Sequence, residues 1–354
     1  MKIIQVINSL RYRGGAQVFL YDLVNELKKC GHEVLVIALY GNIDPSFNDL
    51  NVKTMNKRKK IDFKASRRLK KTILNFEPDV VHFHLSCLPS YFHGFGYKKQ
   101  KFILMETMHS IPNTTMNFYS RYLRKQFIKK DLLTLVAITK TLGEFATNLY
   151  KKEITYINNG FKRITSLNEV EKKYDLIIVA NMDSNKNHIL LFQAINELKN
   201  DNLSLTLLCI GGGELLEKNK ELIDKMGLSK QVFFMGPVVD VYTYLIKSKI
   251  FVLSSLREGN PISVLEAMGA GLPVIVPNIG GLPDIVEDNV NGLLYSVNDI
   301  DELKKSIMIL MNDNKKRKEI GNHNFIYSAQ FDIKNTTKEY IYLYNKLIKE
   351  ENNE

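Results

Sequence analysis

Two glutamates, Glu258 and Glu266, stand eight positions apart in the second half of the chain, and both could bind a hydroxyl-rich ligand. An ionised carboxylate accepts hydrogen bonds and donates none, so its natural partners are the hydroxyl groups of sugars and riboses. Taken alone, the pair could equally be a turn residue and a solvated helix residue. The surrounding residues must decide between these two interpretations.

A strand, a turn and a helix must position the two carboxylates. The apolar run from Ile250 to Leu253 has the length and character of a buried strand. Gly259, Asn260 and Pro261 then break the strand, and the apolar spacing from Ile262 to Met268 predicts a helix. The free N–H groups at the start of that helix would face the carboxyl end of the strand, where α/β sheets bind phosphate groups.

This segment resembles the E-x7-E motif of the retaining GT-B glycosyltransferases, in particular glycosyltransferase family 4. The likeness continues through the A-M-G-A-G-L-P-V-I run, where the helix passes into the next strand, and through the turn at Gly280. It implies that Glu258 contacts hydroxyls of the donor sugar and that Glu266 holds the ribose of the nucleotide. It also implies a donor site lined by the residues between them, namely Gly259, Asn260, Pro261, Ile262 and Ser263.

Lys186 is the residue that the resemblance assigns to the leaving group. Breaking the bond between an anomeric carbon and a nucleoside diphosphate leaves negative charge on the phosphate, which fixed positive groups stabilise. The family pattern G-R-x4-K keeps its lysine here but has Asn181 in place of the arginine, which removes a charge and a rigid fork of donors. The helix start near Ile262, with Arg13 or Arg257, would have to supply the remaining charge. The pattern also permits a weak or inactive enzyme.

The first half of the chain carries further residues that match the family. Gly14 and Gly15 follow the first apolar run and open a helix, as in the family's glycine-rich loop, where backbone N–H groups approach a diphosphate or an acceptor. His109 matches the histidine that the family places beside the donor sugar. His82 and His84 resemble the family's H-x-H at a strand end, and we expect His84 at most to line the cleft.

A chain of 354 residues exceeds one ordinary domain. Two series of short apolar runs alternate with helical patterns, which predicts α/β domains with parallel sheets covered on both faces. The runs are 3–8, 33–39, 80–84, 102–105, 133–138 and 154–157, and then 175–180, 203–210, 232–235, 250–253, 273–276 and 292–295. The resemblance implies a GT-B fold, with two Rossmann-like domains, a cleft between them and a C-terminal helix that crosses back to the first domain.

The resemblance also implies a division of labour between the two domains. We expect residues 1–162, with 335–354 packed on them, to form the domain that faces the acceptor and the membrane. Residues 163–334 would then form the domain that binds the nucleotide-sugar donor. These boundaries follow the change from the first series of strands to the second.

The net charge of +11 is concentrated in the first domain. Residues 1–165 carry 28 Lys and Arg against 12 Asp and Glu, whereas the remainder carries 21 against 26. Basic residues gather in 53–71 and again in 117–130, where they alternate with apolar ones, a pattern typical of helices that lie on anionic membranes. The residues expected to face the membrane are Arg121, Arg124, Lys125 and Lys129. An ordinary solvated face is the main alternative, and no nucleic-acid motif accompanies the charge.

The sequence also predicts where the protein works. The N-terminus runs directly into a strand pattern without a signal peptide, and no apolar run approaches the roughly 20 residues that span a bilayer. Cys30, Cys87 and Cys209 have neither metal-ligand nor disulfide spacing, so we expect them to be reduced core residues. These features predict a cytoplasmic protein, bound peripherally at the inner face of the cytoplasmic membrane.

Together with the resemblance, these features imply a retaining hexosyltransferase of bacterial polysaccharide, lipopolysaccharide or capsule biosynthesis. Its donor would be a nucleotide sugar, with a UDP-sugar favoured over a GDP-sugar, and its acceptor a glycan or lipid-linked oligosaccharide. No metal ion is expected, because no Asp-x-Asp or similar pair stands at a strand end. Two alternatives stay open: a nucleotide-sugar-binding scaffold subunit, favoured by Asn181, and a GT-B-type sugar-nucleotide epimerase.

Overall fold

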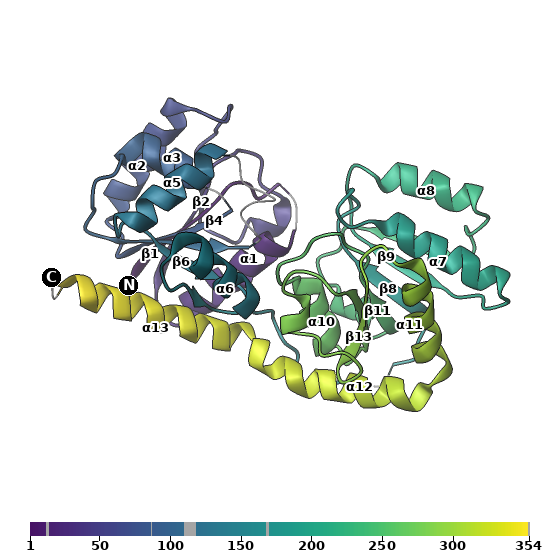
Figure 1. The fold of residues 1–354 in the computed structure, drawn as a ribbon. Helices are drawn as coiled ribbons and strands as arrows, with labels where there is room; N and C mark the ends of the chain where they lie inside the picture. The colour runs from purple at the N-terminus through teal and green to yellow at the C-terminus, as the bar shows by residue number, and fades with distance from the viewer. Residues whose placement is uncertain (12–13, 86, 110–117, 168–169, 353–354) are drawn as a thin grey trace. The chain divides into compact units, whose positions relative to one another are not determined.

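The computed structural model describes residues 1–354 apart from 12–13, 86, 110–117, 168–169 and 353–354 (Figure 1). Its internal contacts divide the chain into two compact units. Unit 1 comprises Met1–Gly160 and Ile333–Glu354, and unit 2 comprises Phe161–Asp332. Each unit contains one parallel sheet with its own helices, so the two are described separately.

The sheet of unit 1 has seven parallel strands in the order β3-β2-β1-β4-β5-β6-β7. The order changes direction between β1 and β4, as in doubly wound Rossmann sheets, whose ligands bind beyond the carboxyl ends of the strands at that switch point. Most strands are unbroken apolar runs because both faces of the sheet are covered. They are β1 (Lys2–Ile7), β2 (Glu33–Ala38), β3 (Val52–Thr54), β4 (Val80–His84), β5 (Ile103–Met108), β6 (Thr134–Ala137) and β7 (Thr155–Tyr156).

Helices cover both faces of this sheet (Figure 1). Alternate residues of β1 point to opposite faces, so Ile4 and Val6 enter the core shared with α2, α3 and α5, whereas Gln5 contacts α13. The C-terminal helix α13 packs against α1 and β5, which confirms that it returns to the first unit. The helices are α1 (Gly15–Lys29), α2 (Phe63–Phe76), α3 (Leu88–Phe95), α5 (Phe118–Lys129), α6 (Lys140–Tyr150) and α13 (Ile333–Asn352), with a 3-10 turn at η1 (Pro45–Phe47).

Unit 2 repeats the arrangement with six parallel strands in the order β10-β9-β8-β11-β12-β13, and its switch point lies between β8 and β11. Its strands are β8 (Tyr174–Val179), β9 (Leu207–Ile210), β10 (Val232–Gly236), β11 (Ser248–Val252), β12 (Val274–Pro277) and β13 (Gly292–Tyr295). Its helices are α7 (His188–Asn200), α8 (Leu216–Lys225), α9 (Tyr242–Leu245), α10 (Ile262–Gly269), α11 (Ile300–Asn312) and α12 (Asn314–Tyr327), with 3-10 turns at η2 (Leu282–Asp284) and η3 (Ser328–Phe331).

The expected α/β fold with two Rossmann-like sheets is confirmed, with two local differences. The short edge strand β3 was not expected, because it falls within the basic stretch and has a single apolar residue, Val52. Cys87 and Cys209 are buried, but Cys30 is exposed because it caps the end of α1, so the expectation of a core cysteine is wrong there. Within the described ranges, no helix combines the length and apolarity needed to cross a bilayer.

Candidate active site

Unit 2 brings two of the predicted residues into direct contact at its switch point. Lys186 lies in the loop after β8 and Glu258 in the loop after β11, and these strands are neighbours in the sheet. The Nζ atom of Lys186 lies 2.6 Å from Oε1 of Glu258, although 72 positions separate them in the chain. The lysine side chain is 21% exposed and the glutamate side chain 9%, so the pair is largely shielded from water.

Hydrogen bonds fasten the two loops to each other. Oδ1 of Asp183 accepts from the backbone N–H groups of Asn185, at 2.9 Å, and Lys186, at 3.1 Å, which shapes the turn before the lysine. The hydroxyl of Ser254 donates to the carbonyl of Lys186 at 2.9 Å, and the N–H of Leu256 donates to the carbonyl of Asn185 at 2.8 Å. The position of Lys186 is therefore set by the same loop that carries Glu258.

A third loop supports the backbone of Glu258. Gly280, which follows β12, has a φ of +56°, and a Cβ atom there would lie 1.9 Å from the carbonyl oxygen of Glu258. Only glycine allows this approach, since any side chain would overlap the carbonyl. The resemblance singled out Gly280 without a mechanism, and the structure supplies one.

Helix α10 begins directly after the Glu258 loop. Pro261 precedes its first turn and accepts a hydrogen bond from the N–H of Val264 at 3.1 Å, while the apolar residues of the helix are buried. Ser263 and Glu266 are partly exposed and three positions apart, so they share the accessible side of the helix. Of the other predicted donor-site residues, Asn260, Pro261 and Ile262 are buried, and Asn181 and Gly259 are partly exposed.

Arg13 or Arg257 was expected to supply the positive charge that the family's arginine would provide, and the structure describes only Arg257. Arg257 is exposed, and its Nε atom donates to Oδ1 of Asn185 at 3.2 Å, so the loop before Lys186 holds its guanidinium. Arg13 lies outside the described residues. Among the described residues, the cationic group in an ion pair with Glu258 is therefore Lys186.

Two features of this site were missed at the sequence level. Gly211 and Gly213 follow β9 with φ values of +139° and +147°, and Cβ atoms there would lie 2.0 Å and 2.4 Å from the carbonyl oxygens of Ala180 and Met182. These glycines pack on the loop that carries Asn181. In the sequence, the run of three glycines directly after a strand could have indicated this close packing.

His188 is the second missed feature. It stands in the first turn of α7, two positions after Lys186, and neither ring nitrogen has a hydrogen-bond partner in the part of the chain that the structure describes. Burial lowers the pKa of its imidazole to about 4, which outweighs the nearby carboxylate of Asp183. The ring is therefore uncharged at neutral pH. Nothing in the local sequence pattern distinguished it from an ordinary helix residue.

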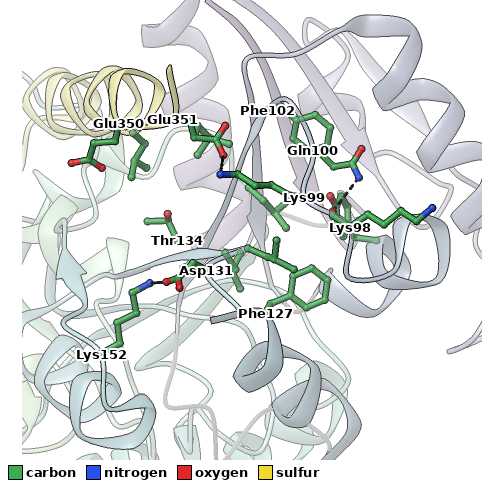
Figure 2. Close-up of a pocket in the computed structure, with 16 residues that line it drawn as sticks. Lys98, Lys99, Gln100, Phe102, Phe127, Asp131, Thr134, Lys152, Glu350 and Glu351 are labelled. Carbon is green, nitrogen blue, oxygen red and sulfur yellow. Dashed lines mark hydrogen bonds and ion pairs between the residues drawn. The ribbon is translucent and has the colours of Figure 1, made fainter. Parts of the chain in front are cut away.

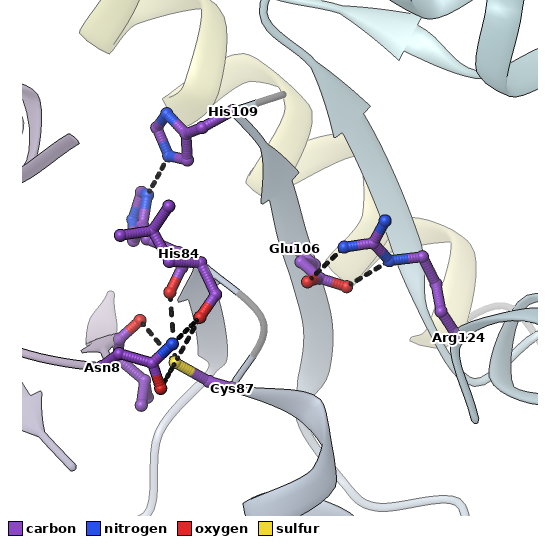
Figure 3. Close-up of polar contacts among 8 residues, drawn as sticks. Asn8, His84, Cys87, Glu106, His109 and Arg124 are labelled. Carbon is purple, nitrogen blue, oxygen red and sulfur yellow. Dashed lines mark hydrogen bonds and ion pairs between the residues drawn. The ribbon is translucent and has the colours of Figure 1, made fainter. Parts of the chain in front are cut away.

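Unit 1 places its predicted residues near its own switch point. Helix α1 begins at Gly15, and Gly14 caps it with a carbonyl that accepts from the N–H groups of Gln17 and Val18 at 3.0 Å each. His82 and His84 both project from β4 and are wholly buried, so His84 lies beneath the surface. Its Nδ1 atom lies 3.1 Å from Nε2 of His109, which is partly exposed (Figure 3). Burial lowers the pKa of His109 to about 4.

Arg124 was expected to face a membrane, and the structure contradicts this. Its side chain is 3% exposed, and its Nε and Nη2 atoms lie 3.0 Å and 2.7 Å from the two carboxylate oxygens of the buried Glu106 (Figure 3). Burial alone would lower the pKa of this guanidinium, but the ion pair with Glu106 outweighs burial and raises it. Arg124 therefore anchors α5 to β5.

The remaining residues of α5 form part of a mixed basic and aromatic surface. Lys125 and Lys129 are exposed and Arg121 is half-buried. Helices α2, α3 and α5 pack side by side. The ring centroid of Phe63 on α2 lies 5.2 Å from that of His93 on α3. Nε2 of His93 is hydrogen-bonded to the hydroxyl of Tyr119 on α5 at 3.0 Å. We call this surface the α2–α5 face; its exposed members are Phe63, Arg67, Lys71, Phe118, Tyr119, Tyr122, Lys125 and Lys129.

A cavity of about 220 Å³ opens elsewhere on unit 1 (Figure 2). Its walls include Ile103 and Thr134, where β5 and β6 begin, and Leu347 near the end of α13. Ion pairs lie around it, with Nζ of Lys99 3.4 Å from a carboxylate oxygen of Glu351. The cavity lies at the amino-terminal ends of the strands, whereas the candidate residues of unit 1 lie at the carboxyl ends. We therefore assign the cavity no part in the reaction.

Comparison with protein families gives two adjacent matches. Residues 13–162 match the family described as Glycosyltransferase Family 4, and residues 161–325 match the family described as Glycosyl transferases group 1. An uncharacterized glycosyltransferase of Haemophilus influenzae is 27% identical over 348 residues, which cover 92% of this chain and 95% of that protein.

A second relative and one solved structure are also similar to this chain. The UDP-Gal:alpha-D-GlcNAc-diphosphoundecaprenol alpha-1,3-galactosyltransferase of Escherichia coli is 31% identical over 160 residues, which cover 44% of this chain and 41% of that protein. A crystal structure of S. aureus TarM has a TM-score of 0.83 at 13% identity and covers 97% of this chain and 99% of that one. That likeness establishes a shared fold.

Proposed function

Because this chain belongs to the GT-B glycosyltransferases, with a Glycosyltransferase Family 4 first half and a Glycosyl transferases group 1 second half, we propose that it transfers a sugar from a nucleotide donor with retention of configuration. Such a reaction needs a site that binds the nucleotide, stabilises the departing diphosphate and orients the sugar. Unit 2 offers residues for each of these tasks.

The observation that carries the proposal is the ion pair between Lys186 and Glu258 at the switch point of unit 2. In the complex with the donor, the ammonium group of Lys186 would bind the diphosphate, whose charge grows as the anomeric bond breaks. The carboxylate of Glu258 would then accept hydrogen bonds from hydroxyls of the sugar. Each group keeps the other in place until the donor provides a partner for both.

The nucleotide is assigned to α10. Glu266 lies on the accessible side of this helix and would accept hydrogen bonds from both ribose hydroxyls. The free N–H groups at the start of the helix, around Ile262 and Ser263, would add to the positive potential near the diphosphate. Together with Lys186, they would offset the missing arginine at Asn181. The acceptor hydroxyl would attack from the leaving-group face and lose its proton to a phosphate oxygen, so no protein base is required.

We favour a UDP-sugar as donor and a lipid-linked glycan as acceptor. The E. coli relative is named for transfer from UDP-Gal to a diphosphoundecaprenol-linked GlcNAc, and TarM was crystallised with UDP. A GDP-sugar is the alternative donor. Because a lipid-linked acceptor is held in a membrane, the enzyme would have to bind the membrane surface to reach it.

The α2–α5 face is the surface that we assign to an anionic membrane, on the cytoplasmic side. It combines exposed aromatic rings, such as Phe63 and Phe118, with lysines and arginines, and this combination suits the boundary between headgroups and acyl chains. Among the described residues, no carboxylate lies within 4 Å of Arg67, Lys71 or Lys125. These charges are therefore available to anionic lipids.

A second candidate function, a nucleotide-sugar-binding scaffold subunit, is favoured by Asn181 alone. The two functions separate in a donor screen in which UDP- and GDP-sugars are incubated with the protein and release of free nucleoside diphosphate is measured. We expect slow hydrolysis of one UDP-sugar, with the released sugar first appearing in the anomeric configuration of the donor by proton NMR. Binding without hydrolysis would support the scaffold, and inverted sugar would contradict retention.

A further inference from the structure

Six buried polar side chains form a continuous network between the sheet of unit 1 and the C-terminal helix α13. None of them is more than 1% exposed. They come from β1, β4, β5 and α13, which lie far apart in the sequence. The six residues are Gln5, His82, His84, Thr107, Tyr340 and Tyr344.

The strand register brings these side chains together. Gln5 is paired with His82 across β1 and β4, and His84 is paired with Thr107 across β4 and β5. His82 and His84 are two positions apart and therefore point to the same face of the sheet. On α13, Tyr340 and Tyr344 are four positions apart and share one side of the helix.

Gln5 stands at the centre of the network. On one side its Oε1 atom lies 2.7 Å from Nε2 of His84. Nδ1 of His84 lies in turn 3.1 Å from Nε2 of His109, and Figure 3 shows this contact. On the other side Nε2 of Gln5 donates to the hydroxyl of Tyr344 at 3.3 Å. His109 is thus the last member of one branch.

The other branch runs along α13. The hydroxyl of Tyr344 lies 2.8 Å from Nδ1 of His82, and Nε2 of His82 lies 2.7 Å from Oγ1 of Thr107. The hydroxyl of Thr107 lies 2.9 Å from that of Tyr340. Because the hydroxyl of Tyr344 accepts from Gln5, its own proton is directed to His82.

The three histidines are uncharged at neutral pH. Burial lowers the pKa of His82 to about 3 and that of His109 to about 4, and it lowers the pKa of His84 well below its ordinary value. A neutral imidazole has one N–H donor and one lone pair. Each contact in the network therefore fixes which nitrogen carries the proton.

The polarity of the branch to His109 follows from the amide of Gln5. A carbonyl oxygen can only accept, so Nε2 of His84 must carry its proton, and Nδ1 of His84 must be the acceptor. The bond at 3.1 Å then requires a proton on Nε2 of His109. Reversing the amide of Gln5 would reverse every bond in the branch and move the proton of His109 to Nδ1.

We propose that Gln5, held by Tyr344, sets the tautomer of His109, so that its Nδ1 atom is a neutral hydrogen-bond acceptor for a ligand group that carries a proton. Nδ1 of His109 has no hydrogen-bond partner among the described residues, and Figure 3 shows it directed away from His84. An acceptor nitrogen cannot bind a phosphate oxygen by hydrogen bonding, so this tautomer selects hydroxyl groups at that position.

Nitrogen-15 NMR of the full chain labelled at histidine tests the tautomer. Long-range proton–nitrogen correlations should show Nε2 of His109 as protonated and Nδ1 as bare, with the signals assigned by their loss in His109→Gln. In Gln5→Met the acceptor for His84 is gone, and in Tyr344→Phe the amide of Gln5 loses a partner. Both variants should therefore show a mixture of His109 tautomers.

Tyr340→Phe is the matched control, because it removes a buried hydroxyl of the same helix but leaves both bonds of Gln5 intact. It should keep the wild-type tautomer of His109, and circular dichroism should show all variants folded. Protonated Nδ1 in the wild type, or one unchanged tautomer in Gln5→Met and Tyr344→Phe, would overturn the proposal.

Discussion

Lys186 and Glu258 hold opposite charges 2.6 Å apart in a position where neither side chain is fully exposed. Partial burial makes such a pair sensitive to the loss of either member, because the remaining charge stays incompletely solvated. The sequence motif predicted both residues, and the spacing of 72 positions could not by itself reveal their contact. That contact depends on the order of strands β8 and β11.

The two glutamates should differ in what they bind. Glu266→Ala should weaken binding of the bare nucleoside diphosphate by roughly 1.5 to 3 kcal/mol, because the charge-assisted hydrogen bonds that we propose between Glu266 and the ribose would be lost. Glu258→Ala should leave that affinity nearly unchanged but lower turnover and discrimination between donor sugars, since in the proposed complex Glu258 would contact the sugar alone. Calorimetry with nucleoside diphosphates and steady-state kinetics measure the two effects. Equal losses of bare nucleotide in both variants would refute the division of roles.

Arg124 shows where single-residue prediction failed. It stands three positions before Phe127 and next to Leu123, both buried, so the helical period alone placed it on the inner side of α5. The basic character of the stretch outweighed that signal in the sequence interpretation. Its partner Glu106 lies on another element, and no local pattern indicated that pairing.

At the scale of elements, most strands were predictable because parallel strands buried on both faces are unbroken apolar runs. Helix α10 was predicted to within one residue, since Pro261 and Gly269 mark its ends. The short strand β3 was missed because its stability comes from pairing with β2 and not from its own composition. Likewise, the support that Gly280 gives to Glu258 needs the fold to become visible.

The α2–α5 face carries a prediction of its own. If it docks on membranes, the protein should float with anionic vesicles at low salt and detach as salt rises, because exposed charges are screened beyond roughly 10 Å at 0.1 M. The triple variant Arg67→Glu, Lys125→Glu, Lys129→Glu should no longer float but should keep nucleotide binding. A control with the same change of charge on exposed residues of unit 2, Lys218→Glu, Lys225→Glu and Lys230→Glu, should float like the wild type. Equal flotation of both triple variants, or none by the wild type, would exclude the docking surface.

At the scale of the whole molecule, buried neutral histidines link stability to pH. In the folded protein the pKa values of His82, His109 and His188 are lowered to about 3, 4 and 4. In the unfolded chain each imidazole has its ordinary pKa near 6.5 and becomes protonated below that pH. The unfolded state therefore binds more protons as pH falls below 6.5, and the folded state loses stability. Each imidazole contributes up to about 1.4 kcal/mol per pH unit in the window from 6.5 down to 5.

Denaturant unfolding at pH 8, 7, 6 and 5 checks this expectation. The free energy of unfolding should be nearly constant between pH 8 and 7 and should fall below pH 6.5. Replacing His188, which has no hydrogen-bond partner among the described residues, by Gln should reduce the slope of the fall. A free energy that is constant or rises between pH 6.5 and 5 would contradict the assignment of neutral buried rings.

The most direct measurement concerns the pair at the switch point of unit 2. Isothermal titration of UDP and, in parallel, GDP into the wild type should show binding of one of them. Lys186→Met should weaken that binding by at least tenfold, because a charged hydrogen bond to phosphate is worth roughly 1.5 to 3 kcal/mol. Lys249→Met is the matched control, since Lys249 also pairs with a carboxylate, that of Asp175 at 2.7 Å, but at the start of β11 and not at its end. This control should bind the nucleotide within twofold of the wild type. Equal affinity of Lys186→Met and the wild type, or no binding of either nucleotide to the wild type, would contradict the assignment of Lys186 to the diphosphate.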